Sequence, residues 1–159
     1  LILFVIEIER KFLVKNDNFK HEAIRALKMT QGYFSKDPMR TVRIRISGEQ
    51  AFITVKGEVS KSGASRFEWE KSILVEEAQH LIAMCLDGVI NKIRHYVQYE
   101  NHLFEVDEFL DDNHGLIVAE VELDNENEVF KCPEWLGKEV TGKKKYYNSQ
   151  LSQNPFRRW

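Results

Sequence analysis

The sequence predicts an α+β fold dominated by an antiparallel β-sheet of about eight strands that closes into a barrel, with amphipathic helices packed outside. Segments in which charged and apolar side chains alternate recur along the chain, and this pattern is typical of strands with two different faces. Most are joined by short turns, without the strand–helix rhythm of a parallel sheet. Two further segments have apolar residues at helical spacing.

The first predicted strand covers residues 5–14 and sets the pattern. Glu7, Glu9 and Lys11 lie on one face, and β-branched and aromatic side chains occupy the other. An amphipathic helix with a basic outer side is expected over residues 18–29, because apolar residues recur there at helical spacing after a possible cap. A short strand, residues 31–34, follows it.

A hairpin is predicted next, with strands at residues 41–46 and 51–57. Arg43 and Arg45 share one face of its first strand, opposite three β-branched residues. On the second strand Lys56 shares a face with threonine. The charged face of this hairpin is therefore basic.

Arg66, Glu68 and Glu70 alternate with two aromatic residues in the strand predicted at residues 66–70. A second amphipathic helix is expected over residues 76–86. The last three predicted strands, residues 89–99, 103–109 and 116–123, carry the charged pairs Lys92 and Arg94, Glu105 and Asp107, and Glu120 and Glu122. From residue 133 the chain is expected to form short helical turns and a polar tail.

These charged faces are expected to line one shared surface. The apolar faces need cover, which the helices can supply, and a barrel of about eight strands leaves room inside for side chains and one small ligand. An open sheet with its charged side in water is the simpler alternative, but it does not require arginine and carboxylate pairs on strand after strand. An outer-membrane barrel is disfavoured by the helices between strands and by the absence of a signal segment.

Bulk composition limits the possible partners. At 159 residues the chain is expected to form a single domain, residues 1–159, and its net charge of −2 argues against a dedicated nucleic-acid binder. Its two cysteines lie far apart, which favours a reducing cytoplasm over a disulfide framework. The apolar opening is too short for a secretion signal, and no segment approaches the roughly 20 apolar residues of a membrane helix. We therefore expect a cytoplasmic protein that binds neither nucleic acid nor membranes.

The mixture of charges indicates a particular ligand. Desolvated charges are costly unless they are paired, so a lumen crowded with both signs suggests that the charges have a function. Arginine and lysine suit phosphate oxygens, and carboxylates suit Mg²⁺ or Mn²⁺. Both together point to a metal-chelated polyphosphate.

The motif Glu7-x-Glu9-x-Lys11 resembles that of the CYTH domain family, also called triphosphate tunnel metalloenzymes. Similar motifs follow in order: TVRIR at 41–45, TVKG at 54–57, FEWE at 67–70, EVDEF at 105–109 and EVE at 120–122. The family includes class IV adenylate cyclases, thiamine triphosphatases and inorganic tripolyphosphatases. The resemblance spans nearly the whole chain, is greatest to the short single-domain bacterial members, and implies an eight-stranded tunnel.

The resemblance also implies site residues. Substrate-binding residues would be Lys11, Arg43, Arg45, Lys56, Arg66, Lys92, Arg94 and Lys145. Metal-binding residues would be Glu7, Glu9, Asp107, Glu120 and Glu122, with Glu68 nearby. Catalytic roles would fall to Lys11, Arg45, Lys56 and Glu70. Lys145 is matched within residues 140–148, where Lys143 and Lys144 replace the acidic residue and proline that family members often have.

The expected function is hydrolysis of a triphosphate, either inorganic tripolyphosphate or a simple organic or nucleoside triphosphate, with Mg²⁺ or Mn²⁺, by a monomer or homodimer. Two alternatives remain open. A class IV-type adenylate cyclase would share the phosphate-binding residues but must also hold a purine. A non-catalytic polyphosphate- or nucleotide-binding module would keep the basic residues and lose the metal ligands.

Overall fold

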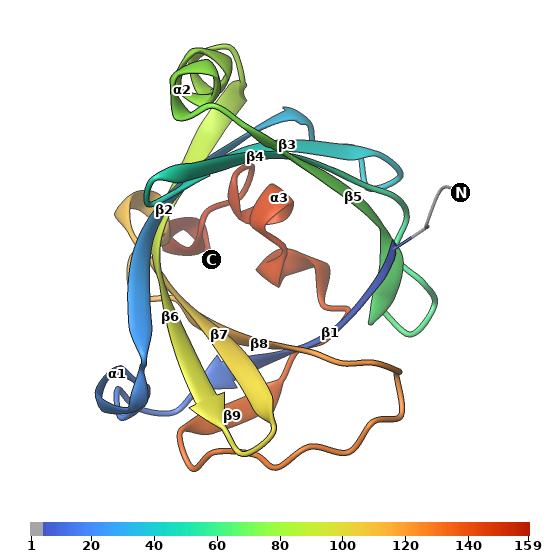
Figure 1. Cartoon of the computed structure of the whole chain (residues 1–159), viewed down its shortest axis with the longest axis vertical. Coiled ribbons are helices and arrows are strands. Elements are labelled where there is room, and N and C mark those ends of the chain that lie inside the picture. Colours follow the sequence, from blue (N-terminus) through green and yellow to red (C-terminus); the bar gives the residue numbers. More distant parts are fainter. Residues whose placement is uncertain (1–4) are drawn as a thin grey trace.

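Eight antiparallel strands form a closed barrel in the computed structural model, which describes residues 5–159 (Figure 1). Around the ring the order is β1-β5-β4-β3-β2-β6-β7-β8, and β8 pairs with β1. The strands are β1 Val5–Val14, β2 Arg25–Ser35, β3 Thr41–Ser47, β4 Gln50–Lys56, β5 Ser65–Ile73, β6 Leu86–Tyr99, β7 His102–Phe109 and β8 Ile117–Glu122. The predicted fold class is confirmed. Residues 1–4, part of the apolar opening considered above, lie outside the described range.

Strand β1 forms the seam of the barrel. One edge pairs with β8, and the other pairs first with β5 and then with β9, Leu136–Glu139. The change of partner follows Ile8, which lies opposite Ser65, and β9 begins its pairing at Phe12. The C-terminal part of the chain is thereby attached to the barrel wall.

The helices are short. They are α1 Phe19–Glu22, α2 Val75–Ala83, α3 Asn148–Leu151 and the 3₁₀ turns η1 Asp111–Asn113, η2 Lys144–Tyr146 and η3 Phe156–Arg158. Helix α2 confirms the helix expected over residues 76–86 and packs outside the barrel, where Ala78 contacts a cluster that includes Ile44 of β3. Among residues 5–159 no helix combines the length and apolar character needed to cross a bilayer.

The helix expected over residues 18–29 is wrong for most of its length. Only α1 is helical, and residues from Arg25 onward belong to β2. Leu27 and Met29 lie opposite Arg94 and Lys92 of β6, so their spacing of two residues places them on one face of a strand. Pairing of β2 with strands on both edges outweighed a helical spacing that the same apolar residues also satisfy. Strand β9 was not predicted either, because short helical turns were expected from residue 133.

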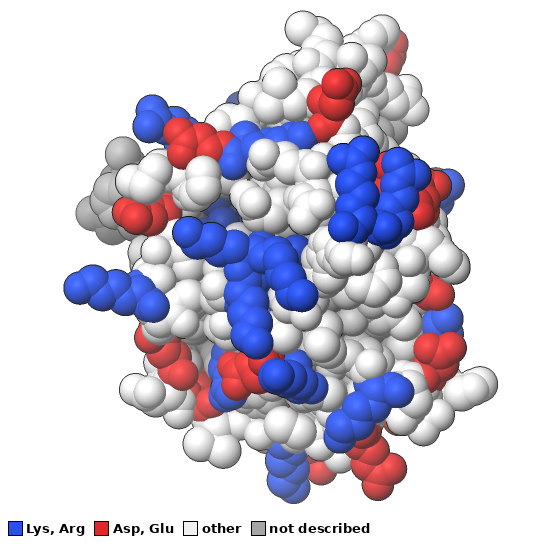
Figure 2. Space-filling view, turned by 180° about the vertical axis from the view of Figure 1, so that it is seen from behind, with Lys and Arg blue, Asp and Glu red and all other residues white. Residues whose placement is uncertain are grey.

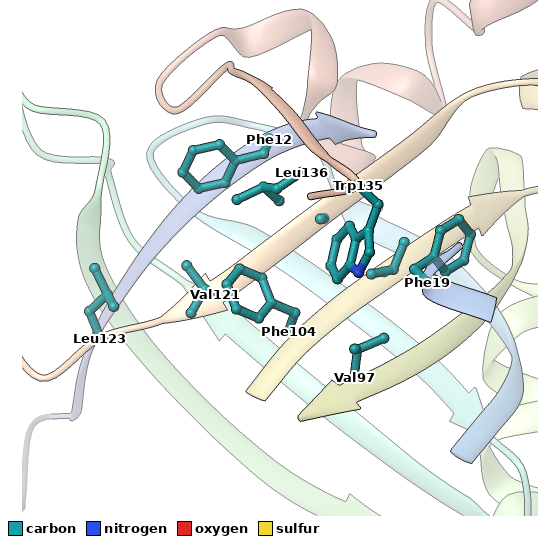
Figure 3. Packing of buried hydrophobic residues seen from close by; sticks show 10 residues of the cluster. Phe12, Phe19, Val97, Phe104, Val121, Leu123, Trp135 and Leu136 are labelled. Carbon is teal, nitrogen blue, oxygen red and sulfur yellow. The ribbon is translucent and has the colours of Figure 1, made fainter. Parts of the chain in front are cut away.

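The main apolar core lies outside the barrel (Figure 3). Outward-facing Phe12, Phe104 and Val121 are covered by Phe19 of α1 and by Trp135 just before β9. The indole Nε1 of Trp135 donates a hydrogen bond to Glu22, at 3.0 Å. This cover leaves the charged faces pointing inward.

A second apolar cluster fills one end of the barrel interior. Along four strands the inward-facing side chain two residues from a charged one is apolar: Leu13 after Lys11, Ile90 before Lys92, Phe109 after Asp107 and Val118 before Glu120. Val140, Tyr146 and Leu151 of the C-terminal segment pack against this cluster. We call these three residues the apolar plug, and Figure 1 shows α3 lying within the ring of strands.

Candidate active site

A cavity of about 470 Å³ occupies the other end of the barrel interior. All eight barrel strands contribute to its wall, and most of the contributed side chains are charged or polar. Of the predicted site residues, its wall includes Glu7, Glu9, Lys11, Arg43, Arg45, Lys56, Arg66, Glu68, Glu70, Lys92, Arg94, Glu120 and Glu122. The structure therefore brings together residues that are more than one hundred positions apart in the sequence.

The two arginines of β3 form a basic wall with unsatisfied donors. Arg43 and Arg45 each lie 3.7 Å from the same oxygen of Glu70, and Arg43 also donates to Thr54. Within residues 5–159 the buried Nε atoms of both arginines have no hydrogen-bond partner. Repulsion from Arg43, together with burial and Arg94, lowers the pKa of Arg45 to about 10. An anion in the cavity would satisfy these donors and relieve the repulsion.

Two lysines form close ion pairs with carboxylates across the cavity. Lys11 Nζ lies 2.9 Å from Glu120, and Lys56 Nζ lies 2.5 Å from Glu7 and 3.1 Å from Glu68. Burial alone would lower the pKa of Lys11, but Glu120 and Glu9 outweigh it, so the pKa is raised. The Lys11 ammonium therefore remains charged at neutral pH because acids surround it.

An acidic wall lies where β1 meets β8. Glu9 is directly opposite Glu122 in the strand register, and within residues 5–159 neither carboxylate makes an ion pair or side-chain hydrogen bond. Burial, Glu120 and Glu7 raise the pKa of Glu9 to about 7. Burial and Glu7 also raise the pKa of Glu122. Like charges facing each other across a strand pair are destabilising.

This donor set fits a hard divalent cation. Carboxylate oxygens are the ligands that Mg²⁺ and Mn²⁺ prefer, and a cation between Glu9 and Glu122 would remove their repulsion. The other acids are engaged, since Glu7 pairs with Lys56 and Glu120 with Lys11. In the described part of the chain no three potential ligands already stand in a metal-binding arrangement. Lys11 and Lys56 therefore compete with a cation for these acids.

Asp107, expected as a metal ligand, does not line the cavity. It is buried inside the barrel, next to the cavity, where it accepts hydrogen bonds from Arg94 at 2.7 and 2.8 Å and another from Lys92. Burial lowers the pKa of Lys92 to about 8, with Asp107 acting in the opposite direction. Asp107 thus holds two cations at the cavity wall.

Lys145, expected as a substrate ligand, also lies away from the cavity. Its ammonium stands 4.2 Å from the centre of the Trp159 ring on an exposed part of the C-terminal segment. Exposed Lys and Arg side chains occur elsewhere on the outer surface too (Figure 2). The same segment contributes Tyr147, Asn148 and Ser149 to the cavity instead. No role was predicted from sequence for these three, although they are flanked by the plug residues Tyr146 and Leu151.

Comparison with known proteins gives a consistent picture. Residues 5–154 match the CYTH domain family. The chain is 44% identical over 152 residues to a protein named inorganic triphosphatase from Acetivibrio thermocellus, covering 95% of this chain and 96% of that one.

Solved structures agree with the sequence comparison. The structure of the inorganic triphosphatase NE1496 superposes with a TM-score of 0.65 at 32% identity, covering 93% of this chain and 95% of that one. The PH1012 protein from Pyrococcus horikoshii OT3 gives a TM-score of 0.60 at 22% identity, covering 76% of this chain and 80% of that one, and it supports the fold alone.

Proposed function

The chain belongs to the CYTH domain family, and we propose on this premise that it is a metal-dependent triphosphatase whose substrate is inorganic tripolyphosphate. One observation carries the proposal. Unsatisfied guanidinium donors of Arg43 and Arg45 and unpaired carboxylates of Glu9 and Glu122 line one cavity. A phosphate chain with a divalent cation would satisfy both sets.

The basic residues would bind and orient the phosphate chain. Arg43 and Arg45 would donate to its oxygens through guanidinium groups, and Lys56 would act as a point charge. Glu70 lies beside both arginines and Thr54 accepts a hydrogen bond from Arg43, so these guanidinium groups need little reorganisation as negative charge develops during phosphoryl transfer. Lys11, Arg66, Lys92 and Arg94 complete the proposed phosphate site.

Glu7, Glu9, Glu120 and Glu122 would hold Mg²⁺ or Mn²⁺. When bound, such a cation neutralises phosphate charge and lowers the pKa of a coordinated water. We assign Asp107 a positioning role instead of the metal-binding role that the sequence suggested, because it holds Arg94 and Lys92 through hydrogen bonds within the barrel interior. Similarly, Glu70 is proposed to position the two arginines of β3.

An inorganic chain suits the cavity better than a nucleotide. Most side chains that line the cavity are charged or polar, and few are apolar or aromatic, such as Leu103 and Tyr33, whereas a purine requires apolar or aromatic surface. The relative that is 44% identical is named an inorganic triphosphatase. We therefore rank the adenylate cyclase below the triphosphatase. We propose a cytoplasmic location, because both cysteines are free thiols, as in a reducing compartment. A monomer or homodimer is the proposed oligomeric state.

The test is a panel of tripolyphosphate, ATP and thiamine triphosphate, each with Mg²⁺ or Mn²⁺. We expect metal-dependent orthophosphate release that is fastest with tripolyphosphate. Glu9→Gln should abolish this release without unfolding the protein, and Glu49→Gln on the exposed β3–β4 turn is the matched control. Formation of cyclic AMP would favour the cyclase, and tight binding without turnover of any compound would favour a binding module.

A further inference from the structure

The barrel interior is closed at one end by the protein's own C-terminal segment. The apolar plug packs against Ile90, Phe109 and neighbouring residues inside the barrel. Asn148 stands where this apolar filling meets the charged cavity, because it lines the cavity while Leu151 of the same short helix is in the plug. A linear ligand can therefore extend out of the cavity in one direction only.

The amide of Asn148 is held in a defined orientation. Its Oδ1 accepts hydrogen bonds from Lys92 Nζ at 3.1 Å and from Gln31 Nε2 at 3.3 Å. A lysine ammonium only donates, so it fixes the oxygen side of the amide. Gln31 has no exposed surface, and its Nε2 also donates to the Tyr33 hydroxyl at 3.0 Å. This fixed network lies on the floor of the cavity.

The Nδ2 group of Asn148 is left as an available donor. Within residues 5–159 it donates no hydrogen bond. Lys92 lies beside it and carries a positive charge compensated by Asp107. The closed end thus offers an amide donor next to an ammonium group, a combination suited to phosphate oxygens.

We propose that Asn148 recognises the end of a phosphate chain. The terminal phosphate would lie against Asn148 and Lys92, and the remaining chain would leave through the open end. An internal phosphate is bonded to neighbours on both sides, and the plug leaves no space for one of them. This inference rests on the proposed triphosphatase function and adds the substrate class: phosphate chains with a free end.

End-on binding makes hydrolysis proceed from chain ends. In each turnover one water oxygen forms a bond to phosphorus and one bridging P–O bond breaks. The bridging oxygen remains on the leaving phosphate, and the water protons are shared between the products and solvent. A long chain would shorten stepwise, without fragments from its middle.

The decisive experiment compares linear tripolyphosphate with cyclic trimetaphosphate, which has three phosphates and no end. Affinities are measured by calorimetry without divalent metal, so that the metal-dependent hydrolysis does not consume the ligand, for the wild type, Asn148→Ala and the control Gln150→Ala, whose side chain lies on the same helix. We expect Asn148→Ala to weaken linear tripolyphosphate about tenfold and to leave the cyclic compound unchanged, as loss of one hydrogen bond to a charged group implies. Gln150→Ala should change neither affinity. Equal effects of Asn148→Ala on both compounds, or no effect, would overturn the proposal.

Two additions separate possible failures. If Asn148→Ala lowers the melting temperature strongly, Asn148→Ser, which keeps a polar side chain, replaces it in the same comparison. Wild-type hydrolysis of a polyphosphate of medium length is followed by gel electrophoresis, and early mid-length fragments would contradict end-on binding. Absence of any hydrolysis would contradict the proposed function, while the ratio of the two affinities would still test the role of Asn148.

Discussion

The two ends of the barrel interior are built on the same strands from opposite kinds of side chain. On β1 the inward face changes from Lys11 to Leu13, and on β6 from Lys92 to Ile90. At the charged end, unsatisfied donors and repelling carboxylates cost folding free energy. At the plugged end, the burial of apolar side chains stabilises the folded state. On these strands, the residues that bind the ligand and the residues that stabilise the fold are therefore only two positions apart.

The largest effect is expected at the charged end. Arg45→Ala removes a guanidinium with an unsatisfied donor, and turnover of tripolyphosphate should fall about a thousandfold, as for loss of one preorganised donor in other enzymes. The free energy of unfolding should not decrease, because repulsion from Arg43 and Arg94 is relieved. Steady-state kinetics and urea unfolding measure the two quantities. Lower stability with unchanged turnover in Arg45→Ala would contradict the assignment of this end of the barrel to binding.

The plugged end should respond in the opposite way. Leu151→Ala removes a buried side chain of the apolar plug, and the free energy of unfolding should fall by about 2–4 kcal/mol, the usual cost of such a cavity. The turnover of folded Leu151→Ala should decrease by a smaller factor than the turnover of Arg45→Ala. Val129→Ala, on a side chain that is 89% exposed, is the control for loss of an apolar group. Equal free energies of unfolding for Leu151→Ala and Val129→Ala would show that the apolar plug does not stabilise the fold.

The cost of the charged end to stability should also depend on pH, through the ionisation of Glu9. The Glu9 pKa is raised from 4.5 to about 7 by burial, Glu120 and Glu7, so its ionisation opposes folding. This cost is absent below the unfolded-state pKa, grows between the two pKa values and is complete above the folded-state pKa. Without metal, Glu9→Gln should therefore stabilise the protein by about 3 kcal/mol near pH 8 and by little near pH 4.5.

Thermal unfolding across this pH range checks the prediction, with Glu49→Gln as the control for removal of an exposed carboxylate. Stabilisation by Glu9→Gln that did not change with pH would contradict the assigned electrostatic cost.

The smallest effect is expected outside the barrel. Lys145→Ala removes an exposed ammonium that stacks on Trp159, and the free energy of unfolding should change by about 0.5 kcal/mol or less. Turnover and KM for tripolyphosphate should remain within about twofold of the wild type, because this side chain does not reach the cavity. A large increase in KM would restore the substrate-binding role that the sequence resemblance implied for Lys145.

The inward charged faces could be predicted from sequence because strand alternation is a local property. Glu7, Glu9 and Lys11 share a face in any strand, and so do Arg43 and Arg45. Strand β2 could not be predicted from its own residues, since its apolar spacing also fits a helix and its neighbours β3 and β6 decide the outcome.

The positions of individual site residues were predicted less completely. Asp107 lies on the same inward face as Glu105, but its position along the strand places it deeper in the barrel interior, against Arg94 and Lys92. The role of Asn148 depends on how the C-terminal segment enters the barrel, and no local pattern encodes that path. Depth along the barrel axis is set by strand stagger, which a single sequence does not reveal.

The most direct test of the central claim is a crystal structure with tripolyphosphate and Mn²⁺, using anomalous scattering to locate the metal. We expect a manganese peak between the carboxylates of Glu9 and Glu122 and phosphate density within hydrogen-bond distance of Arg43 and Arg45. Phosphate and manganese bound on the outer surface, with the barrel cavity holding only water, would contradict it.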